Sequence, residues 1–277
     1  MVAAVQTQPA AQKFYRPPYL PMIELRQARG TPACYQAHTH EEFSIGVVDG
    51  GVSDYFIYGR TASIGPGTTV VINPQTVHRC NPGQLQQWSY KMAYLDIAWL
   101  TELQAELSPV HSGQFQCFKL TQMTDVAHYQ NYNRLFSLLT RSDSRLRMET
   151  ALTSYFAALM LLDQQYDHPV FGKCVSHLQR AYDFIVEHCQ ADISIAEVAK
   201  EAGLSHYRLI HAFRQHYGIT PHALQIASRI SVARKMLKSG DRIADVAAET
   251  GFTDQSHFHR HFKRHVAVTP RQYQLPR

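Results

Sequence analysis

Four histidines lie within nine residues near the C-terminal end of the sequence, in the stretch GFTDQSHFHRHFKRHVAVTP, residues 251–270. His257, His261 and His265 are spaced four residues apart, so on a helix they would follow one face, with His259 on another. Imidazole is a common metal ligand, and such a row can hold a metal ion. A zinc finger would also need a nearby pair of cysteines, which this stretch lacks. The two interpretations are an adventitious metal site and a helix with another role.

A second set of residues that could bind a ligand lies in the N-terminal half. In HTHEEFSIGVVDGG, residues 38–51, an extended strand would place His38, His40 and Glu42 on one face. His78 follows a strand-like run, and QWSYKMAYLD places large side chains at alternate positions, on one face of another strand. Aromatic walls with a few polar groups are typical of pockets for small molecules. We expect one pocket to contain His38, His40, Glu42, His78, Trp88, Tyr90 and Tyr94.

The composition is that of a globular protein with two domains. The 277 residues are 45% apolar, which is enough for two buried cores. No apolar run approaches the roughly 20 residues of a membrane helix, and the N-terminal segment lacks the apolar stretch of a signal peptide. The five cysteines are scattered and form no CxxC pair. These features predict a cytoplasmic protein without a membrane partner.

The positive charge is concentrated in the C-terminal part. From Gly172 onward there are 15 Lys and Arg against 9 Asp and Glu, a balance of +6, whereas residues 1–171 carry −1. Eight of the sixteen histidines lie at or beyond His206. This uneven distribution favours a polyanionic partner for the C-terminal part.

The elements that must position these residues change type along the chain. Residues 33–97 contain runs rich in β-branched and aromatic residues, separated by the turn signals DGG, GPG and NPQ. Short strands at this spacing predict a sandwich or barrel. After Asp96, apolar residues recur at helical spacing, and DHPVFG, 167–172, is the best candidate linker. The predicted class is α+β, a β-barrel with helices followed by an all-α domain.

An internal repeat lies in the all-α region. ISIAEVAKEAGLS, residues 193–205, is similar to DRIADVAAETGFT, residues 241–253. Each copy has a short helix with an apolar face, a glycine that permits a sharp turn, and a second helix capped by Ser205 or Asp254. The apolar residues that the second helices would bury are Leu209, Phe213, Phe258 and Phe262. Two matched copies predict paired helix-turn-helix units rather than a generic helical hairpin.

Residues 174–275 resemble the paired helix-turn-helix domain of AraC/XylS-type bacterial transcription regulators. The closing GFTDQSHFHRHFKRHVAVTPRQY is similar to that family's most specific signature, and the connecting helix follows the family's pattern at Ala233, Arg234 and Leu237. The resemblance implies a transcription regulator that binds double-stranded DNA as a homodimer, with RNA polymerase as a further candidate partner.

A helix in the major groove presents residues at i, i+3, i+4 and i+7 on one stripe. The outward stripes should be Tyr207, Ile210, His211 and Arg214 in the first unit, and Ser256, His259, Arg260 and Lys263 in the second. Arg260 can pair bidentately with guanine, whereas Arg214 and Lys263 would hold phosphates. The family usually has arginine in place of His211, so base readout by the first unit should differ. The histidines beside this stripe would then be solvated or face phosphates.

The segments 38–51 and 66–82 resemble the cupin-like barrel in which these regulators bind an effector. A metal-dependent cupin enzyme would add a glutamate three or four residues after the HxH pair, where this chain has Phe43 and Ser44. We therefore predict a small organic effector, with no catalytic residue, metal or cofactor. A cupin-type metal-dependent enzyme or a metal-sensing regulator, either of them using His38, His40 and His78, is one open alternative. Structural hydrogen bonding by these histidines and a barrel that only dimerises are two others.

Three regions follow from these patterns. Residues 1–110 are predicted to form the effector-binding barrel with an N-terminal arm, 111–172 a helical connector and linker, and 173–277 the DNA-binding domain. Family members dimerise through helices at the position of residues 144–166, which makes this helix the candidate interface. Its apolar residues are Leu152, Tyr155, Phe156, Leu159 and Leu162. The alternative is a helix that packs only on its own barrel.

Overall fold

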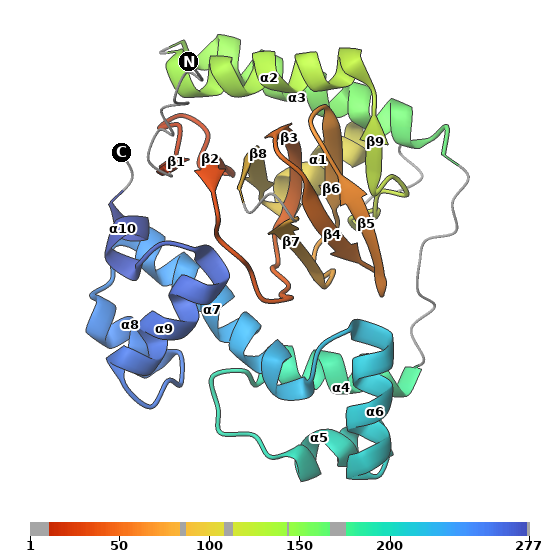
Figure 1. Ribbon diagram of the computed structural model, residues 1–277, viewed down its shortest axis with the longest axis vertical. Helices are drawn as coiled ribbons and strands as arrows, with labels where there is room; N and C mark the ends of the chain where they lie inside the picture. Colours follow the sequence, from red (N-terminus) through yellow and green to blue (C-terminus); the bar gives the residue numbers. More distant parts are fainter. Residues whose placement is uncertain (1–10, 84–86, 108–112, 143, 167–175, 276–277) are drawn as a thin grey trace, which may run out of the picture.

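The computed structural model describes residues 11–83, 87–107, 113–142, 144–166 and 176–275. A β-rich part with helices occupies one end of the long axis, and an all-helical part occupies the other (Figure 1). This arrangement confirms the predicted α+β class. The candidate linker, residues 167–172, lies outside the described residues.

The β-rich part consists of two antiparallel sheets. Within the described residues, the larger has the order β1-β2-β8-β3-β6-β9 and the smaller β5-β4-β7. The strands are β1 (Ala11–Tyr15), β2 (Ile23–Thr31), β3 (Phe43–Gly50), β4 (Ser53–Ile57), β5 (Arg60–Ile64), β6 (Thr68–Ile72), β7 (His78–Pro82), β8 (Trp88–Leu95) and β9 (Gln122–Thr124). The sequence predicted four strand-like runs, FSIGVV, VSDYFIYG, TTVVIN and QWSYKMAYLD, which contain β3, β4, β6 and β8; β1, β2, β5, β7 and β9 were not predicted. Because β9 pairs with β6, the predicted boundary after residue 110 does not coincide with a break in the sheet.

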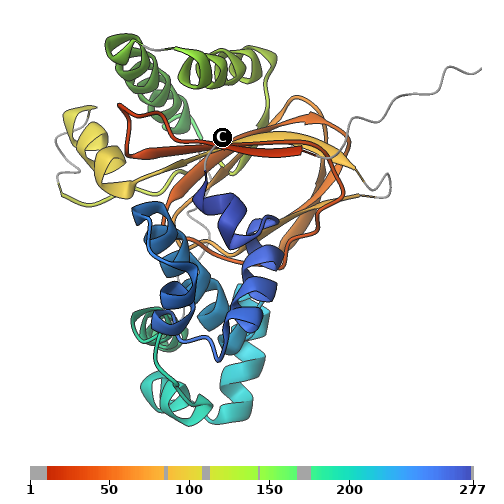
Figure 2. The ribbon, with the colours of Figure 1, turned by 90° about the vertical axis from the view of Figure 1, so that its left-hand side faces the viewer.

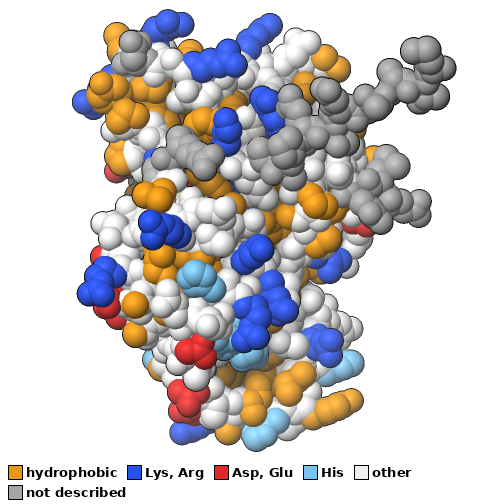
Figure 3. Space-filling view, turned by 60° about the vertical axis from the view of Figure 1, so that its left-hand side comes forward, with side chains coloured by type: hydrophobic (Ala, Val, Ile, Leu, Met, Phe, Trp, Pro, Cys, Tyr) orange, Lys and Arg blue, Asp and Glu red, His pale blue; other side chains and the backbone are white. Residues whose placement is uncertain are grey.

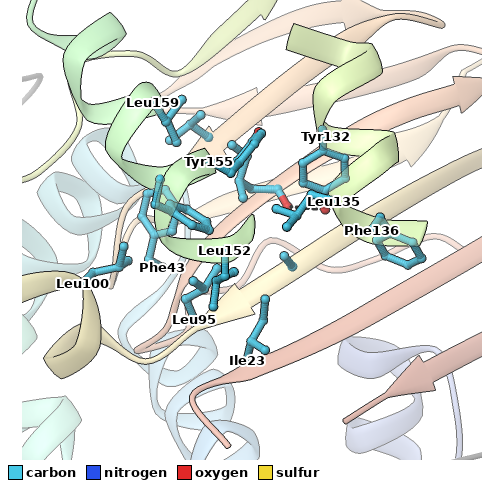
Figure 4. Close-up of a cluster of buried hydrophobic side chains, with 14 of the residues drawn as sticks. Ile23, Phe43, Leu95, Leu100, Tyr132, Leu135, Phe136, Leu152, Tyr155 and Leu159 are labelled. Carbon is cyan, nitrogen blue, oxygen red and sulfur yellow. Dashed lines mark hydrogen bonds between the residues drawn. The ribbon is translucent and has the colours of Figure 1, made fainter. Parts of the chain in front are cut away.

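The strands β2, β3, β6 and β8 of the larger sheet each serve two cores because their side chains alternate between faces. Ile45 and Val47 of β3 point into a cluster formed with the helices α1 (Ile97–Leu107), α2 (Val126–Arg141) and α3 (Arg145–Asp163). Figure 4 shows this cluster, with Phe43 and Leu95 of the sheet beneath Leu152 and Tyr155 of α3. Val48 of β3 and Trp88 of β8 belong to the cluster between the two sheets.

The helix predicted as the dimer interface uses its apolar face within its own chain. Leu152, Tyr155, Phe156 and Leu159 are buried in the cluster against the sheet, and Leu162 packs at its edge. This apolar face is therefore covered by the chain's own sheet, because helical spacing shows that a face is apolar but does not show which surface covers it. A dimer contact on the remaining faces of this helix stays a prediction.

The all-helical part contains the two predicted helix-turn-helix units. Its helices are α4 (Ser176–Glu187), α5 (Ile195–Ala202), α6 (His206–Tyr217), α7 (Pro221–Ser239), α8 (Ile243–Glu249), α9 (Gln255–Val266) and α10 (Pro270–Gln274). α7 connects the units and is buried along most of its length. Leu209 and Phe213 lie in the core of the first unit, and Phe258 and Phe262 lie in the core of the second, as predicted.

The two parts are packed directly against each other, with the helices of the C-terminal part lying below the barrel (Figures 1 and 2). Phe14 of β1 belongs to the core of the second unit and meets the ring of Tyr273 edge-on, with the centroids 5.2 Å apart. Val77 of the barrel belongs to the core of the first unit. Among the described residues, the barrel thus contributes one fully buried apolar side chain to the core of each helix-turn-helix unit.

Candidate functional site

The second helix of each unit, α6 or α9, begins at the predicted N-cap. The side chain of Ser205 accepts a hydrogen bond from the backbone N–H of Arg208, and that of Asp254 accepts one from the N–H of His257. Gly203, which precedes α6 in the turn, has φ of 63°, in the left-handed region that favours glycine. Local sequence therefore determines both the start of each helix and the turn before it.

The outward stripe of α6 matches the prediction. Tyr207 is 79% exposed, and Ile210, His211 and Arg214 are also exposed. The rings of Tyr207 and His211 are nearly parallel, with centroids 6.2 Å apart. This surface can offer an aromatic face, an imidazole and a guanidinium to a groove in DNA.

The outward stripe of α9 matches the prediction in part. Ser256, Arg260 and Lys263 are exposed. His259 was predicted to face outward, but its side chain is half-buried. Its Nε2 is enclosed and has no hydrogen-bond partner among the described residues. On the face shown in Figure 3, Lys, Arg and His side chains are spread over the lower, helical part. Arg260 and Lys263 are the positive groups that α9 presents in the predicted register.

The histidines beside the outward stripe of α9 were predicted to be solvated or to face phosphates, and one of them is not. The rings of His257 and His261 are 4.6 Å apart, and those of His261 and His265 are 6.3 Å apart. His265 is buried instead of solvated, because α9 packs its last turn against the barrel, where the ring of His38 lies 6.2 Å away. Among the residues that the structure describes, no group of three or more His, Cys, Asp or Glu is placed to hold a metal ion.

The barrel encloses a cavity of about 50 Å³ between its two sheets. A water-sized sphere needs roughly 10–15 Å³ on this scale, so the cavity has room for a few waters. The residues that line it are Arg26, Tyr35, His38, Val47, Val48, Ile64, Val70, Ile72, His78, Cys80, Trp88, Tyr90, Met92 and Tyr94. Five of the seven predicted effector residues are among them, and the predicted common face of β8 is observed.

Three barrel histidines form a neutral cluster beside this cavity. The ring centroids of His38 and His78 are 4.5 Å apart, and those of His40 and His78 are 4.9 Å apart. Each ring is oriented by a hydrogen bond between Nδ1 and a backbone carbonyl, at 2.8–2.9 Å. Burial and the neighbouring His40 lower the pKa of His78 to about 3. Burial also lowers the pKa of both His38 and His40. The cluster is therefore uncharged at neutral pH.

Two predicted pocket residues lie outside the cavity. His40 faces the gap between the barrel and α7, and Glu42 forms ion pairs with Arg234 at 3.4 Å and Lys238 at 3.9 Å. The prediction placed them with His38 because alternate residues of one strand share a face. β3 begins only at Phe43, so this periodicity does not apply to the residues before it.

An ionic cluster that was not predicted from the sequence joins the two parts. Glu24 of β2 is 2% exposed and pairs with Arg16 at 2.9 Å, Arg234 at 3.1 Å and Lys238 at 3.3 Å. The hydroxyl of Tyr273 on α10 also donates to Glu24, at 3.0 Å. Although burial opposes ionisation, Lys238, Arg234 and Arg16 hold the pKa of Glu24 below its ordinary value. The charged residues within IELRQARGT were the only sequence signal for this site.

Known proteins resemble both parts of the chain. The profile of an AraC-like ligand binding domain matches residues 20–156, and that of a helix-turn-helix domain matches residues 198–275. An uncharacterized HTH-type transcriptional regulator, YbfI of Bacillus subtilis, is 26% identical over 239 residues, which cover 85% of each chain. The arabinose operon regulatory protein of Escherichia coli is 24% identical over 78% of this chain and 74% of its own length.

The solved structures of ToxT from Vibrio cholerae share the fold. An apo structure of a ToxT variant with one substitution gives a TM-score of 0.61 at 13% identity and covers 91% of this chain and 97% of its own. Wild-type ToxT with a bound unsaturated fatty acid gives a TM-score of 0.60 at 13% identity, over 97% of this chain and 96% of that chain.

Proposed function

Because this chain belongs to the AraC family of transcription regulators, we propose that a small molecule in its barrel cavity controls how its two recognition helices bind duplex DNA. The chain combines a DNA-binding helix-turn-helix region with an N-terminal ligand-binding domain.

For DNA we assign the base-reading role to the exposed stripes of α6 and α9. Arg260 is suited to guanine because its guanidinium can donate two parallel hydrogen bonds to O6 and N7. Arg214 and Lys263, one turn further along each helix, are suited to phosphates. Tyr207 and Ile210 offer apolar contact to thymine methyls or sugars. The remaining members of the proposed DNA surface are His211, Ser256 and His259.

For the effector we assign the cavity lined by His38, His78, Trp88, Tyr90 and Tyr94. ToxT holds an unsaturated fatty acid in one of its solved structures, which supports an organic ligand in a protein of this fold. The cavity of about 50 Å³ is smaller than the roughly 300–1,000 Å³ of many ligand pockets. A metabolite would therefore have to displace side chains of the wall, and Met92 is flexible enough to move. His40 and Glu42 act outside this cavity, at the contact with the DNA-binding part.

The observation that carries the proposal is the buried contact between the two parts. Arg234 of α7, the helix between the two DNA-reading units, lies between the carboxylates of Glu24 and Glu42 of the barrel. Arg234 is 8% exposed. A shift of the barrel strands would therefore either move its guanidinium or leave a buried charge without its partners. An effector that favours one barrel conformation would thereby favour one arrangement of α6 and α9.

The test for DNA binding begins with selection of bound sequences from random duplexes by the full-length chain. Hydroxyl-radical footprinting of the selected site should show two protected segments on one face of the duplex, about 10 bp apart. Protection of a single segment by each chain would contradict the use of both recognition helices.

We propose a homodimer in the cytoplasm that acts on RNA polymerase at its promoters and has no catalytic role. The apolar face of α3 is used internally, but Leu146 and Leu161 on α3 and Val126 on α2 are exposed, the first at 74%. These residues could form the dimer contact, and sedimentation equilibrium of the Leu146→Glu and Leu161→Glu variants would test it. In the described part of the chain, no helix is both long and apolar enough to cross a membrane.

A further inference from the structure

Arg26 is a buried cation without a carboxylate partner among the described residues. It extends from β2, lines the barrel cavity and is 5% exposed. Its Nη2 donates to three neutral acceptors, Gln12 Oε1 and Tyr35 OH at 2.6 Å and Val266 O at 2.9 Å. Arg234, by contrast, lies between two carboxylates. The charge of Arg26 is solvated by neutral groups but not neutralised.

Aromatic rings surround this guanidinium. Its Cζ lies 5.1 Å from the ring centroid of Tyr35, 5.3 Å from that of Phe14 and 5.6 Å from that of Tyr90. Although burial acts in the opposite direction, the phenol groups of Tyr35 and Tyr90 raise the pKa of Arg26 above its ordinary value, so the group is charged. Cation–π contacts stabilise a charge by less than the cost of burying an unpaired ion. The balance favours the binding of an anion.

Two enclosed donors have no acceptor in hydrogen-bonding geometry among the described residues, although the hydroxyl of Tyr94 is a further polar neighbour of the Arg26 guanidinium. They are Nε of Arg26 and Nε1 of Trp88, and both residues line the same cavity. A guanidinium and an indole N–H can only donate hydrogen bonds. The missing groups are therefore acceptors, and a carboxylate supplies two acceptor oxygens together with a negative charge.

The rest of the cavity wall is mainly apolar. The aliphatic residues and methionine that form it are Val48, Ile64, Val70, Ile72 and Met92. An inorganic anion would leave this wall without contacts, whereas an organic acid would bury a hydrocarbon body against it. The combination matches a molecule with one charged end and an apolar remainder.

We propose that the effector is a small monocarboxylic acid whose carboxylate binds Arg26 and Trp88 and whose apolar body packs against the aliphatic wall. This inference rests on the proposed function, because it names the class of molecule for the same cavity. It also identifies a route to DNA, since the Nη2 of Arg26 donates to Val266 O, the last carbonyl of α9. A carboxylate on Arg26 competes for this donor and so alters the contact of the barrel with α9.

The first experiment uses the full-length wild-type protein and pairs of matched compounds. Benzoate and hexanoate are compared with benzamide and hexanamide by isothermal titration calorimetry at pH 7, with inorganic phosphate as an anion that lacks an apolar body. The acids should bind. The amides and phosphate should bind at least about tenfold more weakly, because a hydrogen bond to a charged group is stronger than a neutral one by about this factor in affinity. Equal binding of an acid and its amide, or no binding of either acid, overturns the proposal.

The second experiment identifies the donors. Arg26→Gln removes the charge, and Trp88→Phe removes the indole N–H while it keeps an aromatic ring. Arg29→Gln is the matched control, because Arg29 is an exposed cation on the same strand. Each test variant should lose about tenfold or more of the affinity for benzoate, and the control should lose none. If circular dichroism shows that Arg26→Gln is unfolded, the affinity of Trp88→Phe for benzoate and the comparison of each acid with its amide test the proposal instead. Unchanged affinity in Trp88→Phe contradicts the assignment.

A third measurement separates this inference from the function on which it rests. DNA affinity of wild type and Tyr90→Ala is measured with benzoate and with a panel of neutral sugars and aromatic alcohols. In one outcome, a neutral compound changes the DNA affinity of wild type but not of Tyr90→Ala, and benzoate has no effect. This result overturns the proposal that the effector is a carboxylic acid, and it supports the cavity as the effector site. If both proteins respond alike to whichever ligand is active, the cavity is not the sensor and both proposals fail.

Discussion

Gly218, the C-cap of α6, lies directly against Phe56 of the barrel strand β4, and a β-carbon at Gly218 would stand 2.5 Å from Cζ of that ring. Ala267, the C-cap of α9, occupies the equivalent position in the second repeat. Its φ is 62°, also left-handed, and it packs against the cluster between the two sheets. The C-terminal ends of both recognition helices therefore abut the barrel, which gives the ligand-binding domain a contact with each DNA-reading helix.

This contact predicts that Gly218→Ala separates α6 from the barrel. The added methyl must displace Phe56, and overpacking of this kind costs about 1–3 kcal/mol. Gly240→Ala is the matched control, because Gly240 is the left-handed C-cap of α7 with φ of 95° and no atom within 4 Å of its β-carbon position. Thermal unfolding should show a larger decrease in Tm for Gly218→Ala than for Gly240→Ala. Equal losses would mean that backbone strain alone is measured and that Phe56 can move freely.

Arg260 and Lys263 should differ in the kind of DNA affinity that they provide. Arg260→Ala is expected to cost about 1–3 kcal/mol at the selected site and to relax preference at one base pair. Lys263→Ala should weaken all sequences alike and reduce the dependence of affinity on salt. Fluorescence anisotropy with the selected duplex and its single-base variants, at several salt concentrations, measures both. Unchanged base preference in Arg260→Ala would show that α9 enters the groove in another register.

The ion pairs of Glu42 should stabilise the protein in a pH-dependent manner. Although burial opposes it, Arg234, His40 and Lys238 lower the pKa of Glu42 from about 4.5 to about 2. A lowered carboxyl pKa contributes stability that is fully present above the unfolded-state pKa and is lost as pH falls from about 4.5 towards 2. Glu42→Gln should therefore destabilise strongly at pH 6 and progressively less below pH about 4.5, as measured by urea unfolding.

The control for Glu42 is its neighbour Glu41, which pairs with Lys235 at the surface. An exposed pair of this kind contributes about 0–1 kcal/mol, so Glu41→Gln should change the urea midpoint little at either pH. A loss in Glu41→Gln as large as that in Glu42→Gln would show that burial between the domains is not what gives Glu42 its effect.

The histidine cluster should make the fold sensitive to mild acid. Burial and His40 lower the pKa of His78 from 6.5 to about 3, so below pH 6.5 the unfolded chain binds a proton that the folded chain does not. Stability must then fall between pH 6.5 and 3, by up to about 1.4 kcal/mol per pH unit for this group. His78→Asn, which cannot be protonated, should show a shallower slope of stability against pH than wild type. His222→Asn, an exposed control on α7, should keep the wild-type slope.

The DNA-reading helices could be predicted from the sequence because they depend on local signals. Ser205 and Asp254 cap α6 and α9 through their own side chains, and Gly203 has the left-handed conformation that its turn requires. The core residues follow from the 3.6-residue period, since Leu209 and Phe213 must face inward if Tyr207 and His211 face outward. The alternation along β8 likewise predicted which of its side chains line the cavity.

Only the tertiary structure decided what lies between the domains. In IELRQARGT the apolar Ile23 and Leu25 alternate with the charged Glu24 and Arg26, a pattern that would place the two charges on a solvent face. In the structure, Glu24 and Arg26 are instead buried against α7, α9 and α10. His265 continues the periodic row of His257 and His261 but is buried because the last turn of α9 meets the barrel. Such contacts join residues more than 200 positions apart, and no local period or turn signal records which surfaces meet. Propensity and periodicity are properties of one segment, whereas burial of a charge depends on the partner that folding brings to it.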